Sequence, residues 1–257
     1  MIRPFLPLLL VGAVALTPAF AQPNQSLTVS AAASLKDVLA RLGNDFHTAN
    51  PSTHLNFNFG SSGTLRAQIE AGAPVDVFIA ADDATMSALE KGGNIEAGSR
   101  RVLAGNRLVL VVPADSRLGL RGFRDLMRSD VSRVAVGAPS VPAGKRAREV
   151  FAHLGMGAQI EAKSVRGKDV REVLAQVEAG NVEAGVVYLS DAATTKRVRV
   201  VAVAPASLHG PIRYPAALVS GSKNRALAAR FLAFLSSKHA RAVFQLAHFV
   251  VPNDPKA

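Results

Sequence analysis

A short motif occurs twice in this chain, at residues 68–72 (QIEAG) and at residues 176–180 (QVEAG), with an offset of 176 − 68 = 108 positions. Each copy ends a helical pattern, and an apolar strand follows that runs to an aspartate, Asp82 in the first case and Asp191 in the second. A repeat of this length indicates two units built on one plan. A chain of 257 residues is long enough for both units to bury a core.

The helix before the first copy begins after a strand and a Gly/Ser turn. Residues 55–59 alternate apolar and polar, which predicts a strand, and residues 60–63 (GSSG) lead into a helix that starts at Thr64. Glycine lets the backbone approach a guest, and serine offers a hydroxyl beside its own N–H. Because the first N–H groups of a helix lack internal partners, this junction can hold an anion without a cation. An ordinary N-capped helix would use the same residues.

Comparable junctions occur at three more places in the chain. Ser34 follows an apolar strand and precedes a helical run, with Asp37 at the spacing of a capping box. Ala143 follows Pro142 at the start of another helix, and Val170 lies at the start of a fourth. The carboxyl ends of strands in an open parallel sheet face one crevice. These junctions therefore predict a ligand site between two lobes, lined by hydroxyl and amide donors.

The predicted fold class is α/β, with a mostly parallel sheet flanked by helices in each lobe. The apolar strand at 108–112 marks the first crossing into a second lobe, and residues 214–219 mark a return. We therefore expect lobe 1 at residues 22–105 and 215–257, and lobe 2 at residues 106–214.

The first residues have the features of a secretory signal. Arg3 is followed by an apolar stretch at 8–16 and by Ala19-Phe20-Ala21, which predicts a signal peptide at residues 1–21. The chain has no cysteine, so we expect no disulfide, no thiolate metal site and no lipid on a cysteine. No later segment has the length and apolarity to span a bilayer. These features predict a periplasmic protein that is not inserted in the membrane.

The formal charge is +11, or 11 − 1 = +10 once Arg3 is removed with the signal. Such a charge can attract nucleic acid or an acidic membrane surface. The basic residues are spread along helix faces, however, and are not clustered among aromatics. A solvated face with a general attraction for anions is the favoured interpretation, and we expect no nucleic-acid partner.

Catalytic and metal-binding motifs are absent from the sequence. There is no Gly-x-Ser-x-Gly, no His-Glu-x-x-His and no phosphate loop. Asp82 and Asp83 are adjacent carboxylates, but they open a predicted helix, where acids are favoured by the dipole. The six histidines lie apart, so no metal site is expected. A secreted serine hydrolase that uses Ser62 is a distant alternative to a binding protein.

At these junctions the chain resembles the periplasmic molybdate-binding proteins. The resemblance covers essentially the whole mature chain, and its motifs occur in the family's order: residues 31–35 (AAASL), 60–65 (GSSGTL), 68–76 (QIEAGAPVD), 141–144 (VPAG), 169–171 (DVR), 187–192 (VYLSDA) and 214–215 (YP). It implies a two-lobe clamshell of the type II periplasmic-binding-protein class. Such a protein captures molybdate or tungstate and delivers it to the membrane permease of an ABC importer.

The resemblance also implies the site residues. Ser34 and Ser62 would each offer a hydroxyl and a backbone N–H, Ala143 and Val170 a backbone N–H, and Tyr188 its phenolic hydroxyl. The implied protein is a monomer that needs no cofactor and catalyses no reaction, and its metal arrives as an oxyanion and not as an ion held by side chains.

Two positions depart from the family pattern. Gly63 stands where relatives often carry a third serine, which puts a secondary contact in doubt, and Lys168 could add positive potential near the site.

Donors without an acceptor suit a fully deprotonated oxyanion, since a protonated one such as phosphate needs a carboxylate to accept its hydrogen. Sulfate or another tetrahedral oxyanion remains an alternative ligand, because cavity size is not visible in the sequence.

Overall fold

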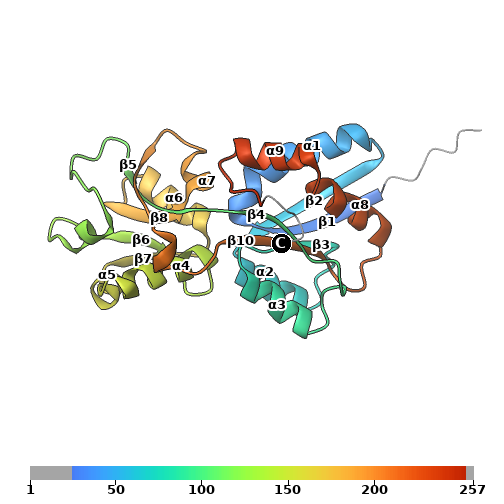
Figure 1. The fold of residues 1–257 in the computed structure, drawn as a ribbon, viewed down its shortest axis with the longest axis horizontal. Coiled ribbons are helices and arrows are strands. Elements are labelled where there is room, and N and C mark those ends of the chain that lie inside the picture. Colours follow the sequence, from blue (N-terminus) through green and yellow to red (C-terminus); the bar gives the residue numbers. More distant parts are fainter. Residues whose placement is uncertain (1–24, 253–257) are drawn as a thin grey trace, which may run out of the picture.

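The structure, a computed structural model, describes residues 25–252, and the predicted signal at residues 1–21 lies outside them. The chain forms two lobes side by side, each with one five-stranded sheet flanked by helices (Figure 1). This architecture confirms the predicted α/β fold of two lobes.

The sheet of lobe 1 has the strand order β2-β1-β3-β10-β4. β1 pairs in parallel with β2 and β3, whereas β10 is antiparallel to both β3 and β4, so β10 alone runs against the other four strands. The strands are β1 Gln25–Ala32, β2 Thr53–Gly60, β3 Val77–Ile79, β4 Arg101–Gly105 and β10 Arg213–Leu218. The helices of this lobe are α1 Lys36–Ala49, α2 Ser62–Glu70, α3 Asp83–Lys91, α8 Arg225–Leu235 and α9 Lys238–Leu246.

The sheet of lobe 2 repeats this arrangement with the order β7-β6-β8-β5-β9. Here β5 is the strand that runs against the others. The strands are β5 Leu108–Pro113, β6 Val134–Gly137, β7 Ser164–Gly167, β8 Ala184–Tyr188 and β9 Val198–Val203. The helices are α4 Pro142–His153, α5 Gly157–Ala162, α6 Val170–Glu178 and the short α7 Leu189–Ala192, with 3-10 turns at Phe123–Met127 and Ala206–Leu208.

The internal repeat of the sequence coincides with two equivalent helices. α2 and α6 start and end 108 residues apart, since 170 − 62 = 108 and 178 − 70 = 108. Each follows an edge strand of its sheet and leads to the strand two places further in, β3 or β8. The one-plan prediction is therefore confirmed by the topology.

Two segments join the lobes. Asn106 and Arg107 connect β4 in lobe 1 with β5 in lobe 2, and residues 204–212 lead from β9 back to β10. The last two helices, α8 and α9, then pack on α1 of lobe 1. The short linker at Asn106 passes directly from one sheet to the other, which places that residue between the lobes.

The helices bury the faces that their sequences predict. In α1, Val38, Leu39, Leu42 and Phe46 recur at helical spacing and are all buried. β5 is apolar throughout because it is an inner strand covered on both sides, and its residues from Leu108 to Val112 are fully buried.

One local prediction is wrong. Ser34 lies in a single 3-10 turn, Ala33–Leu35, and its side chain caps no helix. No capping box forms with Asp37, because the hydroxyl and the carboxylate both have partners distant in sequence. The interpretation of Asp82 is confirmed, since its carboxylate accepts from Thr85 N–H at 2.8 Å as the N-cap of α3.

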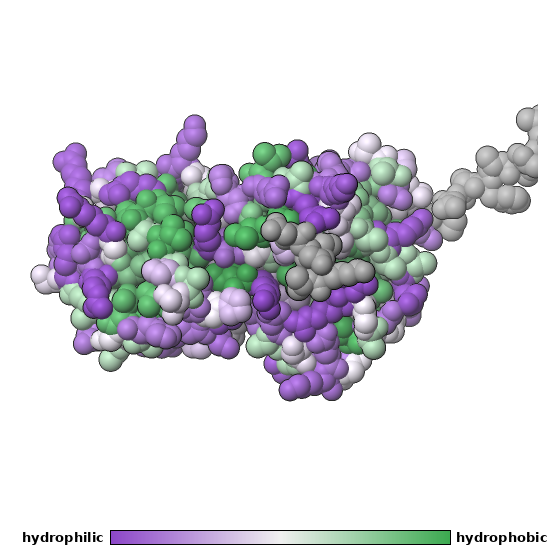
Figure 2. Space-filling model, viewed as in Figure 1, coloured by the Kyte–Doolittle hydropathy of each residue, from purple (hydrophilic) through white to green (hydrophobic). Residues whose placement is uncertain are grey.

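The basic side chains are distributed over both lobes. Hydrophilic residues cover much of each lobe on the face shown in Figure 2 and do not gather at one place. Several of the clustered arginines form ion pairs with acids: Arg100–Asp83, Arg100–Glu90, Arg146–Glu149 and Arg148–Glu161. This distribution agrees with a solvated surface.

Candidate functional site

A small cavity lies between the lobes, where strands of both sheets give way to helices. Ser34, Ser62, Ala143, Val170 and Tyr188 all line it, so the structure brings the five predicted site residues together. Their exposed fractions are between 0% and 4%, which means that the lobes are closed over the cavity. The rest of the lining comes from the same junctions: Ala32, Ala33, Gly60, Ser61, Ala81, Val141, Pro142 and Asp169.

Ser62 is the first residue of α2, and its neighbour Ser61 performs the capping. Ser61 Oγ accepts from the backbone N–H of Thr64 at 3.2 Å, as an N-cap does. Ser62 Oγ instead accepts from the N–H of Ala81, at 2.9 Å, after β3. A serine hydroxyl has one hydrogen to donate. Because Ser62 already acts as an acceptor, that hydrogen is available to a guest in the cavity.

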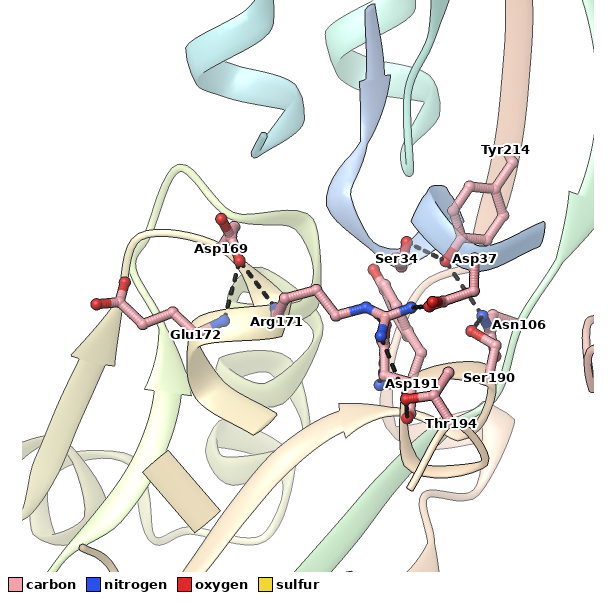
Figure 3. Close-up of polar contacts among 11 residues, drawn as sticks. Ser34, Asp37, Asn106, Asp169, Arg171, Glu172, Ser190, Asp191, Thr194 and Tyr214 are labelled. Carbon is pink, nitrogen blue, oxygen red and sulfur yellow. Dashed lines mark hydrogen bonds and ion pairs between the residues drawn. The ribbon is translucent and has the colours of Figure 1, made fainter. Parts of the chain in front are cut away.

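Ser34 is oriented by a chain of side-chain hydrogen bonds that reaches the linker (Figure 3). Ser34 Oγ lies 3.0 Å from the hydroxyl of Tyr214 in β10. Asn106 Nδ2 donates to that hydroxyl at 3.1 Å and to Ser190 Oγ at 2.8 Å. The N–H of Arg107 donates to Asn106 Oδ1 at 2.9 Å, which fixes the amide orientation.

The number of available hydrogens determines which group donates in each of these hydrogen bonds. Burial raises the pKa of Tyr214, so the phenol keeps its hydrogen at neutral pH. Since the phenol oxygen accepts from Asn106, its own hydrogen goes to Ser34 Oγ. Ser34 then directs its hydrogen away from Tyr214, where an anion in the cavity can accept it.

Tyr188, the last residue of β8, has a buried hydroxyl without a partner. Its side chain is 1% exposed, and within residues 25–252 no group hydrogen-bonds to the phenol oxygen. Burial raises the pKa of Tyr188 well above its ordinary value, and Tyr214 and Asp191 add to the effect. The group therefore remains a donor at neutral pH. An unsatisfied buried hydroxyl costs about 1–3 kcal/mol, so it calls for an acceptor from outside the chain.

Ala143 and Val170 contribute through their backbone. Ala143 follows Pro142, which occupies the first position of α4, and Val170 is the first residue of α6. First-turn N–H groups have no partner inside their helix. The carboxylate of Asp169 accepts from the N–H groups of Arg171 and Glu172 at 2.8 and 3.0 Å and not from that of Val170, a cavity-lining residue whose N–H is thus available to a guest. A site built this way needs no particular side chain at either position.

Gly144 fits α4 against β6. A Cβ added there would meet the carbonyl oxygen of Gly137 at 2.1 Å, so no side chain is possible at this contact. The close approach brings the start of α4 to the carboxyl end of β6, and Ala143 with it.

The electrostatics of the cavity come from neutral donors and helix starts. In the described part of the chain, no lysine, arginine or histidine contributes to the lining. The one acid, Asp169, has its Oδ1 bound by the start of α6. Hydroxyls, amides and the positive ends of α2, α4 and α6 converge, and this arrangement binds an anion by hydrogen bonds and dipoles.

Three residues near the site were missed by sequence reasoning. Asn106 and Tyr214 orient Ser34, and Arg171 joins the lobes beside Val170. Tyr214 belongs to a motif that carries the family resemblance, but its hydroxyl contact spans 180 residues. No periodicity or spacing rule reports a contact of that range.

Two lobes of one topology, closed over a small cavity of convergent donors, define a two-lobe solute-binding protein. The chain belongs to the bacterial extracellular solute-binding proteins, whose family model matches residues 27–250.

Individual relatives extend this assignment. The chain is 39% identical over 221 residues to the putative ABC transporter substrate-binding lipoprotein YvgL of Bacillus subtilis, covering 86% of this chain and 84% of that protein. It is 37% identical over 230 residues to the molybdate-binding protein ModA of Haemophilus influenzae, covering 86% and 88%. Among solved structures, the periplasmic molybdate-binding protein of Azotobacter vinelandii superposes with a TM-score of 0.80 at 26% identity, over 88% of this chain and all of that one.

None of the helices within residues 25–252 combines the length and the apolarity that crossing a membrane requires.

Proposed function

We propose that this protein binds molybdate, and also tungstate, in the interlobe cavity and delivers the anion to the permease of an ABC importer. The observation that carries the proposal is the hydroxyl of Tyr188, which is buried in the cavity wall and lacks an acceptor. The hydroxyls of Ser34 and Ser62 and the helix starts at Ala143 and Val170 direct further donors to the same space. Relatives named as molybdate-binding proteins support this choice of anion.

The size and polarity of the cavity favour a small, fully deprotonated anion. About 10 Å³ of the cavity is open to the centre of a water-sized sphere, which is about the room of one such sphere, so the cavity suits a small guest. Molybdate and tungstate, like sulfate, are dianions without a hydrogen at neutral pH, so a site of donors suits them, whereas phosphate carries a hydrogen that needs an acceptor. A hydrolase that uses Ser62 would need a base near Oγ, and no histidine lines the cavity among the described residues. The geometry therefore supports a receptor better than an enzyme.

The cellular setting is part of the proposal. The protein is exported by the signal at residues 1–21, acts in the periplasm as a monomer without a lipid anchor, and meets a membrane permease there. It needs no cofactor, since the metal arrives as the oxyanion itself.

A series of thermal and chemical unfolding measurements with molybdate, tungstate, sulfate and phosphate tests the proposal. A ligand at 100 times its dissociation constant should add about 2.7 kcal/mol to the free energy of unfolding. We expect this increase with molybdate and tungstate at concentrations where sulfate and phosphate have no effect. A folded protein that millimolar molybdate does not stabilise would refute the proposal, and stabilisation by sulfate alone would reassign the site to sulfate.

A further inference from the structure

The closed cavity raises the question of what keeps the lobes together. All five cavity residues named above are nearly fully buried, so an anion can enter only when the lobes separate. The fraction of closed protein then affects how tightly the anion is held. Contacts that cross between the lobes near the cavity, without touching it, are therefore candidates for a role in binding.

Arg171 makes such a contact. It follows Val170 in α6 of lobe 2, and its Nη2 donates to Asp37 Oδ2 in α1 of lobe 1, three residues after Ser34 (Figure 3). The ion pair thus joins α6 of lobe 2, which starts at the cavity, to α1 of lobe 1, which follows the 3-10 turn that holds Ser34. Neither Arg171 nor Asp37 lines the cavity itself.

The guanidinium of Arg171 is held in place by its own lobe. Its Nη1 donates to Thr194 Oγ1 at 3.2 Å, and its Nε lies 2.9 Å from Oδ1 of the fully buried Asp191. The arginine side chain is 22% exposed, whereas that of Asp37 is 59% exposed. Because the planar fork is already oriented by lobe 2, little side-chain freedom is lost when Asp37 arrives.

We infer that Arg171 and Asp37 form an interlobe clasp that raises the population of the closed form and thereby positions the two halves of the site. The clasp is a positioning device and not a ligand contact. Only its effect on anion affinity rests on the proposed function, since closure of the empty protein can be measured without a ligand.

The size of the effect follows from the degree of exposure. An exposed ion pair changes an equilibrium constant by about two- to fivefold. When the closed form is a minor fraction of the free protein, lowering that fraction raises the apparent dissociation constant by the same factor. We therefore expect loss of the clasp to lower the closed-to-open ratio about two- to fivefold and to weaken anion binding by a similar factor.

Asp37→Asn is the primary test, because it removes the cross-lobe charge and leaves Arg171 paired with Asp191. Asp45→Asn is the matched control, since Asp45 lies in the same helix, is partly exposed and pairs with His239 inside lobe 1. Asp37→Glu keeps a carboxylate that can reach Arg171 and should restore closure.

The chain contains no cysteine, so two introduced cysteines can carry distance probes without interference. Lys91→Cys in lobe 1 and Lys196→Cys in lobe 2 are both at exposed positions. In protein freed of oxyanions, Asp37→Asn should shift the probe distances toward the open form, while Asp45→Asn and Asp37→Glu should match the parent. Equal distributions for Asp37→Asn and Asp45→Asn would overturn the clasp, whatever ligand the protein binds.

A double-mutant cycle tests the pairing itself. Replacing Arg171 by Gln and Asp191 by Asn together removes the cation without leaving the buried carboxylate unpaired. In that background Asp37→Asn should change neither the closed population nor the rate of molybdate release. If the effect of Asp37→Asn persists there, Arg171 is not its partner and the inference fails. If molybdate does not bind at all, only the proposed function fails, and the distance measurement still decides on the clasp.

Discussion

The hydroxyl of Tyr214 lies 3.0 Å from Ser34 Oγ, although the two residues are 180 positions apart in the chain. Tyr214 is fully buried and also receives a hydrogen bond from Asn106, which lies at the first crossing between the lobes. The orientation of a cavity hydroxyl thus depends on the linker and on the strand that returns to lobe 1.

Replacing Tyr214 by Phe should weaken molybdate binding without emptying the cavity of donors. Ser34 would lose the partner that directs its hydrogen to the cavity, and a typical hydrogen bond contributes about 1 kcal/mol, roughly fivefold in affinity. Isothermal titration calorimetry measures the change. An unaltered affinity in a folded variant would show that Ser34 does not depend on Tyr214 for its orientation.

Tyr188→Phe should separate stability from binding. The variant removes a buried hydroxyl that lacks a partner, so the free energy of unfolding of the empty protein should stay level or increase by about 1 kcal/mol. Molybdate affinity should fall by about 1.5–3 kcal/mol, the range for a hydrogen bond to a charged group. Denaturant unfolding and calorimetry give the two numbers. A less stable apoprotein with full affinity would contradict the role assigned to this hydroxyl.

Ser61 and Ser62 form a matched pair of neighbours with different tasks. Ser61→Ala removes the N-cap of α2 and should lower stability by about 0.5–2 kcal/mol with little effect on affinity. Ser62→Ala removes a cavity hydroxyl and should weaken molybdate binding by about 1.5–3 kcal/mol. Denaturant unfolding and calorimetry on both variants distinguish the capping role of Ser61 from the binding role of Ser62. The assignment would be reversed if Ser61→Ala had the larger effect on binding.

Gly63→Ser should hinder closure. A Cβ at position 63 would meet the carbonyl oxygen of Ser140 in lobe 2 at 2.8 Å, so the closed lobes leave no room for it. Overpacking of this kind costs about 1–3 kcal/mol, here only in the closed form, and should appear as weaker binding with unchanged apoprotein stability. Gly157→Ala is the control, because nothing lies within 4 Å of a Cβ there. Tight binding by Gly63→Ser would mean that the lobes close in another arrangement.

Asp191 should give the stability an unusual dependence on pH. Burial raises the pKa of this carboxyl to about 7, against the attraction of Arg171, whose Nε is close but not in hydrogen-bond geometry. The folded protein therefore binds a proton more tightly than the unfolded chain. The stabilising contribution is complete below the ordinary value of 3.8 and is lost as the pH rises through about 7.

Comparison with Asp191→Asn isolates this contribution from those of other groups. Between pH 4 and 7, the wild-type free energy of unfolding should fall relative to that of the variant by up to about 1.4 kcal/mol per pH unit. Urea denaturation at a series of pH values measures the difference. A difference that does not vary with pH would show that Asp191 titrates alike in both states.

The sequence was sufficient for what depends on local pattern. The repeat at an offset of 108 predicted two equivalent lobes, and strand and helix periodicity predicted the four junctions. It was insufficient where distant partners compete for a side chain. Ser34 and Asp37 have the spacing of a capping box, but Tyr214 and Arg171 bind them instead. The local sequence pattern also does not show which of Ser61 and Ser62 caps α2, because Ser62 Oγ accepts instead from the distant N–H of Ala81.

The candidate site residues were predicted from two different kinds of evidence. Hydroxyl side chains at Ser34 and Ser62 suggested binding directly, whereas Ala143 and Val170 were chosen only through the resemblance to a family. Their side chains carry no chemistry, and each lies in the first turn of a helix at the cavity, where a backbone N–H has no partner inside the helix.

The main-chain donor at Val170 makes part of the site invisible to an alanine scan, because no ordinary side-chain truncation deletes an N–H. Proline is the exception. It is well tolerated at the first position of a helix, and the preceding Asp169 already has the extended backbone (φ −151°, ψ 176°) that a following proline requires. Val170→Pro should therefore remove this one N–H donor, with a ring methylene in its place, while the helix behind it persists.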